Sequence, residues 1–339
     1  MDVNFYQNLG PYKLSIIAAE IGCEITSVNA STEFSDIKSL SLAKSKDLSF
    51  LSNKKYLEEY RNSKAGACIV PLDFVDDLEK DIILLKSSNP YYAYAKAIDL
   101  FYKNDKQNSS QIMPSAYIAA TAKIGKNCYI GHNVVIENEV VIGNNCIIES
   151  GTIIDFKVKI GNNARIDSHV TISHTIIGDN VVILPGARLG QDGFGFATDK
   201  GIHKKIYHTG RVIIGNDVEI GANSCIDRGS MNDTIIEDLC RIDNLVQIGH
   251  NAHIKKGAII VAQVGIAGSS TIGSYCALGG QVGVAGHLTI ADYVQIAGQG
   301  GVIQDIKEAG IMGGTPAVPI RDWHKQTILL KKLVKGQLK

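Results

Sequence analysis

Residues 244–302 read NLVQIGHNAHIKKGAIIVAQVGIAGSSTIGSYCALGGQVGVAGHLTIADYVQIAGQGGV, and this stretch decides the fold. An aliphatic residue returns at every sixth position, namely at Ile248, Ile254, Ile260, Ile266, Ile272, Leu278, Val284, Ile290, Ile296 and Val302. A period of six is neither the 3.6 of an amphipathic helix nor the simple alternation of a half-buried sheet. Short strands joined by turns, each with one inward aliphatic side chain, fit this period and bury a core by stacking. The sequence therefore predicts a parallel β-helix.

The same period begins well upstream of residue 244, so the β-helix is predicted to span residues 115–312. Its upstream positions are Ile118, Ile124, Ile130, Ile136, Ile142, Ile148, Ile154, Ile160, Ile166 and Ile172, then Ile177, Ile183 and Leu189, then Ile214, Ile220, Ile226 and Ile236. Two segments interrupt the repeat: QDGFGFATDKGIHKKIYHTGRV at 191–212 and DRGSMNDT at 227–234. Such repeats have to be recognised before any other element is assigned.

The segments on either side of the repeat have other patterns. Residues 1–105 contain helical spacing at 13–22 and 89–103 and short apolar runs at 66–71 and 81–86, which predict a small α/β domain. The polar stretch KNDKQNSSQ at 103–111 indicates a linker, placed at 106–114. Residues 313–339 form a predicted C-terminal helical extension whose helix is basic and amphipathic.

Composition limits the partners and the compartment. Thirty-four basic and 34 acidic residues cancel, which argues against a general binder of nucleic acid or membrane surfaces. No apolar run reaches eighteen residues, and the N-terminus lacks a signal-like pattern, so we expect no membrane span and a cytoplasmic protein. Seven cysteines without a C-x-x-C pair fit a reducing compartment.

The repeat unit, an aliphatic residue followed by glycine, as in IGKNCY, IGHNVV and IGNNCI, resembles that of the hexapeptide-repeat acyltransferases. The resemblance implies a left-handed solenoid with three strands and eighteen residues per coil, an exception to the right-handed rule for parallel crossovers. It also implies a homotrimer with active sites in the clefts between subunits.

With eighteen residues per coil, residues eighteen apart stack about 4.8 Å apart along the axis. His250 then lies below Gly268, and Gln247 lies below a column of three glycines, Gly265, Gly283 and Gly301. Glycine in strands often marks the close approach of another group. We therefore predict a shallow groove that runs along the solenoid from His250.

Two further residues are placed by the same count. His287 stands two coils beyond Asn251, roughly 9.6 Å along the axis, too far for a hydrogen bond to His250 within one chain. Asp243 follows its anchor Ile242 one side of the coil earlier and is a candidate to orient the imidazole of His250. A zinc site is disfavoured, because His250 and His253 cannot supply three ligands.

A closer resemblance rests on DGFGFA at 192–197, RVIIGNDVEIGANSCIDRG at 211–229 and NLVQIGHN at 244–251. Together these segments resemble the UDP-3-O-(3-hydroxyacyl)-glucosamine N-acyltransferases of lipid A biosynthesis, over nearly the whole chain. The resemblance implies transfer of a 3-hydroxyacyl group from acyl carrier protein to the 2-amino group of the UDP-sugar. His250 would be the general base, Gly268 the oxyanion donor, Asp243 the orienting group and His287 an assisting residue. No cofactor is implied beyond the carrier's phosphopantetheine thioester.

Candidate substrate-binding residues follow from the stacking count and from the same resemblance. The groove residues Gln247, Asn251, Gly265, Gly283 and Gly301 are predicted to bind the acyl tail and the sugar. FLSNKKY at 50–56 matches the family's uracil-binding pattern, with the base between the rings of Phe50 and Tyr56 and its edge read by Asn53; a plain strand aromatic followed by a surface tyrosine is the alternative.

The acyl carrier protein is acidic, so basic side chains are candidates to meet it. They are Arg321, Lys325, Lys331, Lys332 and Lys335 in the C-terminal helix, with Lys204 and Lys205 in the first interruption. A solvated face, or a capping helix packed on the trimer, explains the lysines of the C-terminal helix equally well.

Two other classes of function remain open at this stage. One is another hexapeptide acyltransferase, either a UDP-GlcNAc O-acyltransferase, which would lack the domain at 1–105, or a sugar acetyltransferase that uses coenzyme A. The other is a non-enzymatic trimeric scaffold, which predicts that replacement of His250 by alanine is tolerated.

Overall fold

A computed structural model describes residues 6–25, 30–75, 81–102 and 110–336. The chain divides into two compact units, Met1–Gln107 and Asn108–Lys339. The elements of the first unit are β1 (Tyr12–Lys13), α1 (Leu14–Ile21), β2 (Glu24–Ile25), β3 (Glu33–Phe34), β4 (Asp36–Ile37), β5 (Asp47–Phe50), the 3-10 turn η1 (Lys54–Tyr56), α2 (Leu57–Asn62), β6 (Ala67–Pro71), β7 (Ile83–Ser87) and α3 (Pro90–Phe101).

The first unit is a small α/β sandwich. Its sheet has the order β2-β7-β6-β5-β4, with only the β2–β7 pair antiparallel. Helix α1 buries Leu14, Ile17 and Ile21 at helical spacing and stops at Gly22, whose φ of 67° suits the left-handed cap. Helix α3 starts where the Asn-Pro pair predicts, because the side chain of Asn89 accepts a hydrogen bond from the backbone of Tyr92. Both helices pack on the sheet around one apolar core.

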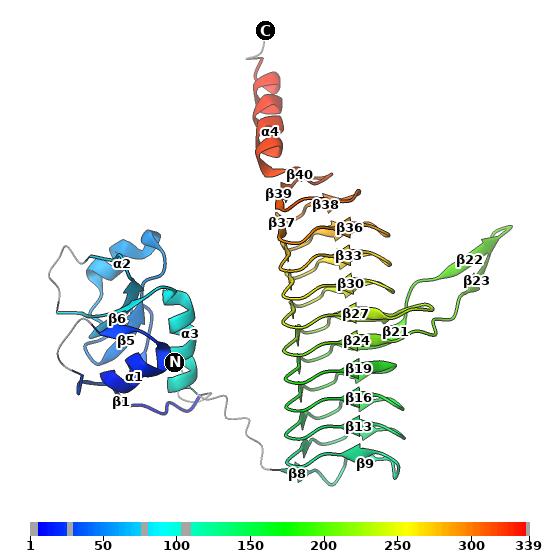
Figure 1. Ribbon diagram of the computed structural model, residues 1–339, viewed down its shortest axis with the longest axis horizontal. Coiled ribbons are helices and arrows are strands. Elements are labelled where there is room, and N and C mark those ends of the chain that lie inside the picture. Colours follow the sequence, from blue (N-terminus) through cyan, green and yellow to red (C-terminus); the bar gives the residue numbers. More distant parts are fainter. Residues whose placement is uncertain (1–5, 26–29, 76–80, 103–109, 337–339) are drawn as a thin grey trace. The chain divides into compact units, whose positions relative to one another are not determined.

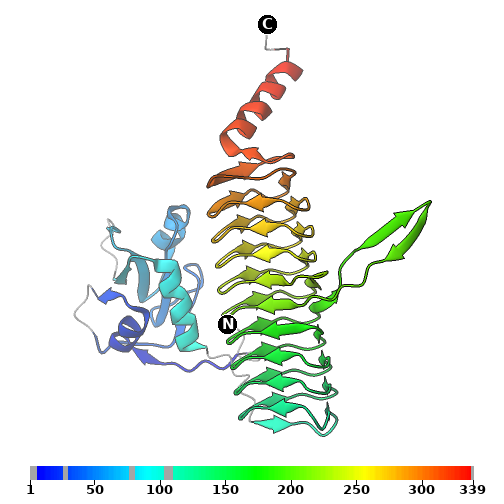
Figure 2. The same ribbon diagram turned by 45° about the vertical axis from the view of Figure 1, so that its right-hand side comes forward.

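The second unit is a triangular solenoid of three parallel sheets, stacked along one axis (Figures 1 and 2). Within the described residues, the ten-stranded sheet contains β9 (Tyr117–Ile118), β12 (Val135–Ile136), β15 (Ile153–Ile154), β18 (Thr171–Ile172), β21 (Arg188–Asp192), β26 (Cys225–Arg228), β29 (Gln247–Ile248), β32 (Gly265–Ile266), β35 (Gly283–Val284) and β38 (Gly301–Val302). The candidate site described below lies on this sheet and at its edge.

The other two sheets complete each coil. The nine-stranded sheet contains β10 (Lys123–Ile124), β13 (Val141–Ile142), β16 (Lys159–Ile160), β19 (Thr175–Ile177), β24 (Val212–Ile214), β27 (Thr234–Ile236), β30 (His253–Ile254), β33 (Thr271–Ile272) and β36 (Thr289–Ile290) in the described residues. The twelve-stranded sheet, counted in the same way, contains β8 (Gln111–Ile112), β11 (Tyr129–Ile130), β14 (Ile147–Ile148), β17 (Arg165–Ile166), β20 (Val182–Ile183), β25 (Glu219–Ile220), β28 (Arg241–Ile242), β31 (Ile259–Ile260), β34 (Ala277–Leu278), β37 (Val294–Ile296), β39 (Gly310–Gly313) and β40 (Val318–Pro319).

The aliphatic residues that recur at every sixth position form the core of the solenoid. In regular coils an anchor pairs with the residue eighteen positions on, as Ile130 does with Ile148. Every predicted anchor from Ile130 to Val302 is buried, whereas Ile118 and Ile124, in the first coil, are half-buried. Burial of each such side chain stabilises the fold by about 1.5–3 kcal/mol. The predicted β-helix is confirmed.

Asparagines at the turns reinforce the stack. Asn127, Asn145 and Asn163 have φ values of 57°, 58° and 56°, in the left-handed region that asparagine tolerates better than most residues. Their side chains form a ladder in which each amide donates to the next, at 3.2 Å and 3.1 Å, and Asn163 donates to Asn180 at 3.0 Å. The recurrent asparagines of the repeat therefore adopt the backbone conformation of the turns and also join consecutive turns by side-chain hydrogen bonds.

The first interruption forms a hairpin that projects from the solenoid (Figures 1 and 2). Its strands, β22 (Phe196–Asp199) and β23 (Ile202–Lys205), pair antiparallel. The two linking residues, Lys200 and Gly201, both have positive φ, as a two-residue hairpin turn requires. Despite this insertion the coil closes in register, because Ile177 pairs directly with Ile214.

Both ends of the solenoid differ in detail from the predicted boundaries. Gln111–Ile112 already pair with β11, so the predicted linker at 106–114 is wrong at its C-terminal end. At the other end β39 adds to β37, β40 folds back on β39, and α4 (Ile320–Val334) follows. Among the residues that the structure describes, none of the helices is long and apolar enough to cross a membrane.

Candidate active site

His250 occupies the turn that follows β29, where it is half-buried. Its Nδ1 lies 2.9 Å from Oδ1 of Asn251. Its Nε2 faces the next coil, because a Cβ placed on Gly268 would lie 2.8 Å from Nε2. The structure thus stacks Gly268 against the imidazole, as the count by eighteens predicts.

The N–H of Gly268, at the corner that follows the ten-stranded sheet, lacks a hydrogen bond that is made at another corner of the coil. At the corner that follows the nine-stranded sheet, the N–H two residues after the aliphatic anchor donates to a side chain one coil further on: Lys126 to Asn144 at 2.8 Å, and Ser274 to Asp292 at 2.7 Å. One coil beyond Gly268 stands Gly286, which has no side chain to accept. Among the described residues the Gly268 N–H therefore has no acceptor and can receive one from a ligand.

A second histidine that sequence reasoning missed packs against the first. The ring centroid of His208 lies 5.0 Å from that of His250, and His208 is 3% exposed. Its Nδ1 has no hydrogen-bond partner in the part of the chain that the structure describes. Burial, followed by the positive charge that His250 acquires on protonation, lowers the pKa of His208, so this ring stays neutral. Only its place at the end of the first interruption could have pointed to it.

The DGFG motif explains how the hairpin reaches His250. A Cβ on Gly193 would lie 2.7 Å from Cβ of His250, so only glycine lets the backbone pass this close. Arg228, from the second interruption, fastens the hairpin by donating to the carbonyls of His208 at 2.8 Å and Gly190 at 3.0 Å. The two interruptions of the repeat therefore converge on one histidine.

Asp192, at the root of the hairpin, forms ion pairs with both Lys205 and Arg228. The hydrogen bond from Lys205, followed by the charge of Arg228, lowers the pKa of Asp192 and keeps it ionised. Lys205, predicted to meet the carrier protein, is therefore engaged within the chain. Lys204 is exposed on β23.

The predicted contact between Asp243 and His250 is not made within the chain. The carboxylate of Asp243 accepts hydrogen bonds from the backbone of Asn244 at 2.7 Å and of Ala262 at 3.1 Å. Asp243 lies at the turn between β28 and β29, one corner of the coil before His250. Its carboxylate therefore accepts hydrogen bonds from backbone N–H groups at that corner instead. The group on the imidazole is Asn251, which was predicted to bind substrate but whose amide is used inside the chain.

A groove lies on the ten-stranded sheet along the predicted glycine column, and its lining includes Gln247 but not His250. It has a volume of about 460 Å³ and a largely apolar lining formed by Gln247, Gly265, Ile266, Ala267, Gly283, Val284, Ala285, Gly301, Val302 and Ile303. A Cβ on Gly265 or Gly283 would meet no atom within 4 Å, so the glycines leave open space. At Gly301 a Cβ would lie 2.9 Å from Cγ2 of Thr315, so the predicted groove is closed by this side chain at Gly301.

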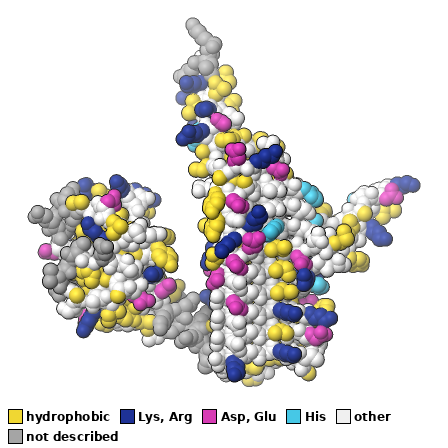
Figure 3. All heavy atoms as spheres, in the orientation of Figure 1, with side chains coloured by type: hydrophobic (Ala, Val, Ile, Leu, Met, Phe, Trp, Pro, Cys, Tyr) yellow, Lys and Arg dark blue, Asp and Glu magenta, His cyan; other side chains and the backbone are white. Residues whose placement is uncertain are grey.

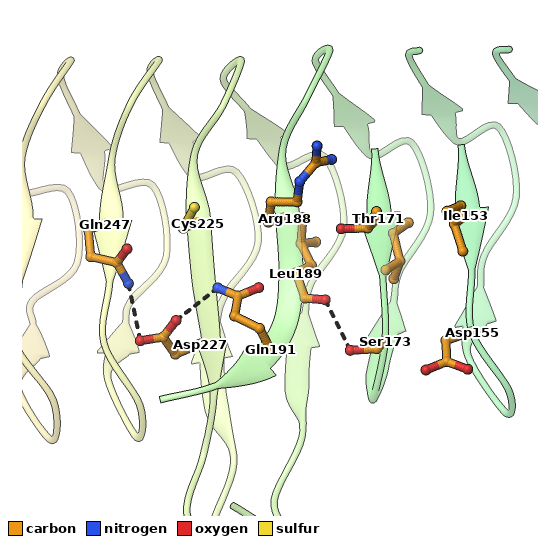
Figure 4. A pocket seen from close by; sticks show the side chains of 11 residues that line it. Ile153, Asp155, Thr171, Ser173, Arg188, Leu189, Gln191, Cys225, Asp227 and Gln247 are labelled. Carbon is orange, nitrogen blue, oxygen red and sulfur yellow. Dashed lines mark hydrogen bonds between the residues drawn. The ribbon is translucent and has the colours of Figure 1, made fainter. Parts of the chain in front are cut away.

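A second hollow lies on the same sheet, across the strands from β15 to β29 (Figure 4). It has a volume of about 430 Å³ and shares Gln247 with the groove. In the lining of this second hollow the carboxylate of Asp227 accepts hydrogen bonds from Gln191 at 2.8 Å and Gln247 at 3.1 Å (Figure 4). Burial raises the pKa of Asp227, and the two amides partly oppose this shift. The repeat pattern gave no signal for this triad.

His287 is exposed, and its N–H donates to the carbonyl of Gly268 at 3.1 Å. It therefore stands one coil beyond Ser269, in the column that begins at Asn251, as predicted. Its φ of 62° belongs to the left-handed turn position. No contact joins His287 to His250 among the described residues, so an assisting role stays a prediction.

In the first unit the three uracil-binding candidates lie on adjoining elements but form no sandwich. Phe50 stacks on Tyr94 of α3, with ring centroids 3.9 Å apart. The Oδ1 of Asn53 accepts a hydrogen bond from the backbone of Lys55 and caps η1. Tyr56 is 41% exposed and makes no ring contact with Phe50. Uridine binding at these residues stays a prediction.

The basic candidates on α4 are all exposed, and Figure 3 shows Lys and Arg side chains along this helix beside hydrophobic ones. None of the side chains in α4 is buried. Elsewhere in the described residues, no group of three His, Cys, Asp or Glu side chains is arranged to hold a metal ion.

Comparison with known proteins gives the family. The model described as UDP-3-O-(3-hydroxymyristoyl) glucosamine N-acyltransferase, LpxD, matches residues 31–100, and the model described as the GMPPB C-terminal domain matches residues 112–231. The UDP-3-O-acylglucosamine N-acyltransferase of Rickettsia prowazekii (strain Madrid E) is 60% identical over 334 residues, 98% of this chain and 96% of that protein. That of Rickettsia bellii (strain RML369-C) is 59% identical and covers 99% of both chains. The chain belongs to the UDP-3-O-acylglucosamine N-acyltransferase family.

A solved structure supports the fold independently. The UDP-N-acetylglucosamine acyltransferase of Arabidopsis superimposes with a TM-score of 0.54 at 23% identity, over 60% of this chain and 71% of that one. This likeness shows the fold alone, a left-handed parallel β-helix, and confirms the predicted hand. As a member of the N-acyltransferase family, the chain is an acyltransferase, and the scaffold reading is excluded.

Proposed function

We propose that this acyltransferase moves a 3-hydroxyacyl chain from acyl carrier protein to the 2-amino group of UDP-3-O-(3-hydroxyacyl)-glucosamine, in the cytoplasm, as a step of lipid A biosynthesis. The observation that carries the proposal is a half-buried histidine whose Nε2 faces Gly268, a residue with an unpaired N–H that directly follows Ala267 in the lining of an apolar groove. Base, oxyanion donor and acyl channel are the three parts that transfer from a thioester to an amine requires.

In the proposed reaction, neutral His250 takes the proton of the attacking amine through Nε2. The amine nitrogen bonds to the thioester carbonyl, whose oxygen becomes an oxyanion that the Gly268 N–H stabilises. Collapse of this intermediate breaks the carbon–sulfur bond. The departing phosphopantetheine thiolate recovers the proton from the His250 imidazolium, which leaves an amide, a thiol and neutral histidine.

The groove provides a measurable property, the acyl-chain length. Replacement of Gly283 by methionine should fill the open space above the floor and shift the preference toward shorter acyl donors, because a long tail would meet the new side chain. We expect kcat/KM to fall at least about tenfold for the longest accepted donor and little for short ones, since one lost buried methylene costs about 0.8 kcal/mol. Rates with a series of acyl carrier proteins measure this profile. An unchanged chain-length profile would contradict the binding of the acyl tail in the groove.

The proposed donor and acceptor are tested together with the wild-type enzyme. Acyl carrier protein should be a far better donor than acyl-coenzyme A, and UDP-3-O-acylglucosamine should yield an amide, whereas UDP-GlcNAc, whose nitrogen is already acylated, should yield nothing. Charge reversal of Arg321 and Lys325 to glutamate should raise the KM for the acidic carrier protein, because both side chains are exposed. An ester formed on UDP-GlcNAc would favour O-acyl transfer instead.

The proposal includes a homotrimer in which a neighbouring copy completes the cleft. Exposed aliphatic side chains on the solenoid, among them Leu245, Ile259 and Val261, support an interface along its length. Sedimentation equilibrium measures the assembly, and a monomeric active enzyme would contradict this part.

A further inference from the structure

The side-chain amide of Asn251 has only one possible orientation, because backbone groups face it on both sides. The N–H of Ser230 lies 3.0 Å from one end of the amide, which must therefore be the oxygen Oδ1. The carbonyl of Asn232 lies 3.0 Å from the other end, which must be the nitrogen Nδ2. The usual ambiguity between the two ends of an asparagine amide is thus removed by the chain itself.

This orientation determines where the proton of His250 resides. Nδ1 of His250 lies 2.9 Å from Oδ1 of Asn251, and an oxygen that already accepts from Ser230 can only accept from Nδ1. A neutral imidazole bonded in this way carries its proton on Nδ1 and a lone pair on Nε2. Free histidine prefers the opposite tautomer. Without the amide the proton would favour Nε2, the atom that must act as the base.

The second interruption of the repeat forms the hydrogen bonds to Asn251. The first interruption, in turn, forms hydrogen bonds and an ion pair with the second. Asn251 also donates its backbone N–H to Oγ1 of Thr234 at 2.8 Å. Asp233 forms a two-point ion pair with Arg211, at 2.8 Å and 3.1 Å. The carbonyl of Ser230 accepts from the side chain of Thr209 at 3.0 Å. An eighteen-residue coil without these insertions would have no carbonyl and no N–H at the two ends of the amide.

We propose that Asn251, clamped by Ser230 and Asn232, is a positioning residue that holds His250 in the tautomer whose Nε2 lone pair faces Gly268. This inference rests on the proposed role of His250 as the base. It assigns to the second interruption a task that the repeat cannot perform. Partners that orient a histidine through its other ring nitrogen typically change activity by about 10- to 100-fold when they are removed.

The test combines the tautomer with kinetics. In wild-type enzyme labelled with ¹⁵N-histidine, the His250 signals, identified by their loss in His250→Gln, should show the proton on Nδ1. Asn251→Gly suits the left-handed φ of 59° but removes the amide, so kcat should fall about 10- to 100-fold and the proton should move toward Nε2. The KM for the UDP-sugar should change little. Asn163→Gly, at a φ of 56° on an equivalent turn, is the matched control and should keep wild-type kcat.

The conservative variant separates a positioning role from a structural one. Asn251→Asp keeps an acceptor for Nδ1 and should recover much of the lost kcat, but its negative charge stabilises the imidazolium. The low-pH side of the rate profile should therefore shift to higher pH, because more of the base is protonated at a given pH. A wild-type signal with the proton on Nε2, or unchanged kcat in Asn251→Gly, overturns the inference. Full activity of a variant without the His250 imidazole would instead overturn the proposed function.

Discussion

Gly286→Asn should lower kcat by about 10²- to 10³-fold, although it introduces a hydrogen bond of the kind made at the corner that follows the nine-stranded sheet. An asparagine at this position would present Oδ1 to the N–H of Gly268, as Asn144 does to Lys126 and Asn162 to Asn144, at 2.8 Å and 2.9 Å. The N–H would then be occupied before the substrate arrives. Loss of one oxyanion donor costs a factor of this size.

The fold should accept the change. A Cβ on Gly286 would lie 3.2 Å from the carbonyl of Gly268, a small adjustment, and its φ is not in the left-handed region. Gly286→Ala adds the same Cβ without an acceptor and should lose much less activity, which separates the hydrogen bond from the added bulk. Thermal unfolding and kcat of the two variants make the comparison. Equal losses in both would refute the oxyanion role of the Gly268 N–H.

The regular part of the molecule was predictable because a single constraint repeats. One inward aliphatic side chain per strand fixes the period, and the period fixes which residues stack. The position of Gly268 against His250 and the glycine groove both follow from that count. The hand of the solenoid came only from family resemblance, since the general rule for parallel crossovers favours the opposite hand.

The details of the site were missed where the period stops. His208, Ser230 and Asn232 lie in the two interruptions, and nothing in their spacing says which coil they touch. Asp243 was assigned to the wrong partner for a related reason. The count predicts stacking along the axis, but whether two corners of the same coil meet depends on the width of the sheet between them.

The first unit shows the same limit. Its helices and inner strands follow from local apolar patterns and the Asn-Pro start of α3. The ring that stacks on Phe50 is Tyr94, from a helix some forty residues away, and such a pairing depends on how α3 packs on the sheet. Local spacing around Phe50 could not show that one face of this ring is already covered.

Replacement of His250 by alanine should have the largest effect of all, a loss of kcat of about 10²- to 10⁴-fold. The Nε2 of His250 is the ring nitrogen nearest to a Cβ built on Gly268 in the described structure. His208 packs against the His250 ring, but the His208 side chain is itself buried. The fold should survive, because the side chain is half-buried and makes one hydrogen bond.

His253→Ala is the matched control for this substitution. His253 lies three residues further on, and its Nε2 pairs with Glu237 at 2.7 Å, away from Gly268. Its removal deletes an imidazole of the same coil without touching the proposed base. We expect kcat of this variant to stay near that of the wild type, with binding of the UDP-sugar unchanged in both variants.

The most direct measurement is the rate of amide formation in a single turnover, with enzyme in excess over acyl carrier protein donor and UDP-sugar acceptor, because it isolates the chemical step from product release. The base at Nε2 of His250 predicts that His250→Ala forms the amide at least about a hundredfold more slowly than the wild type and His253→Ala. Amide formation by His250→Ala within about tenfold of the wild-type rate would contradict it.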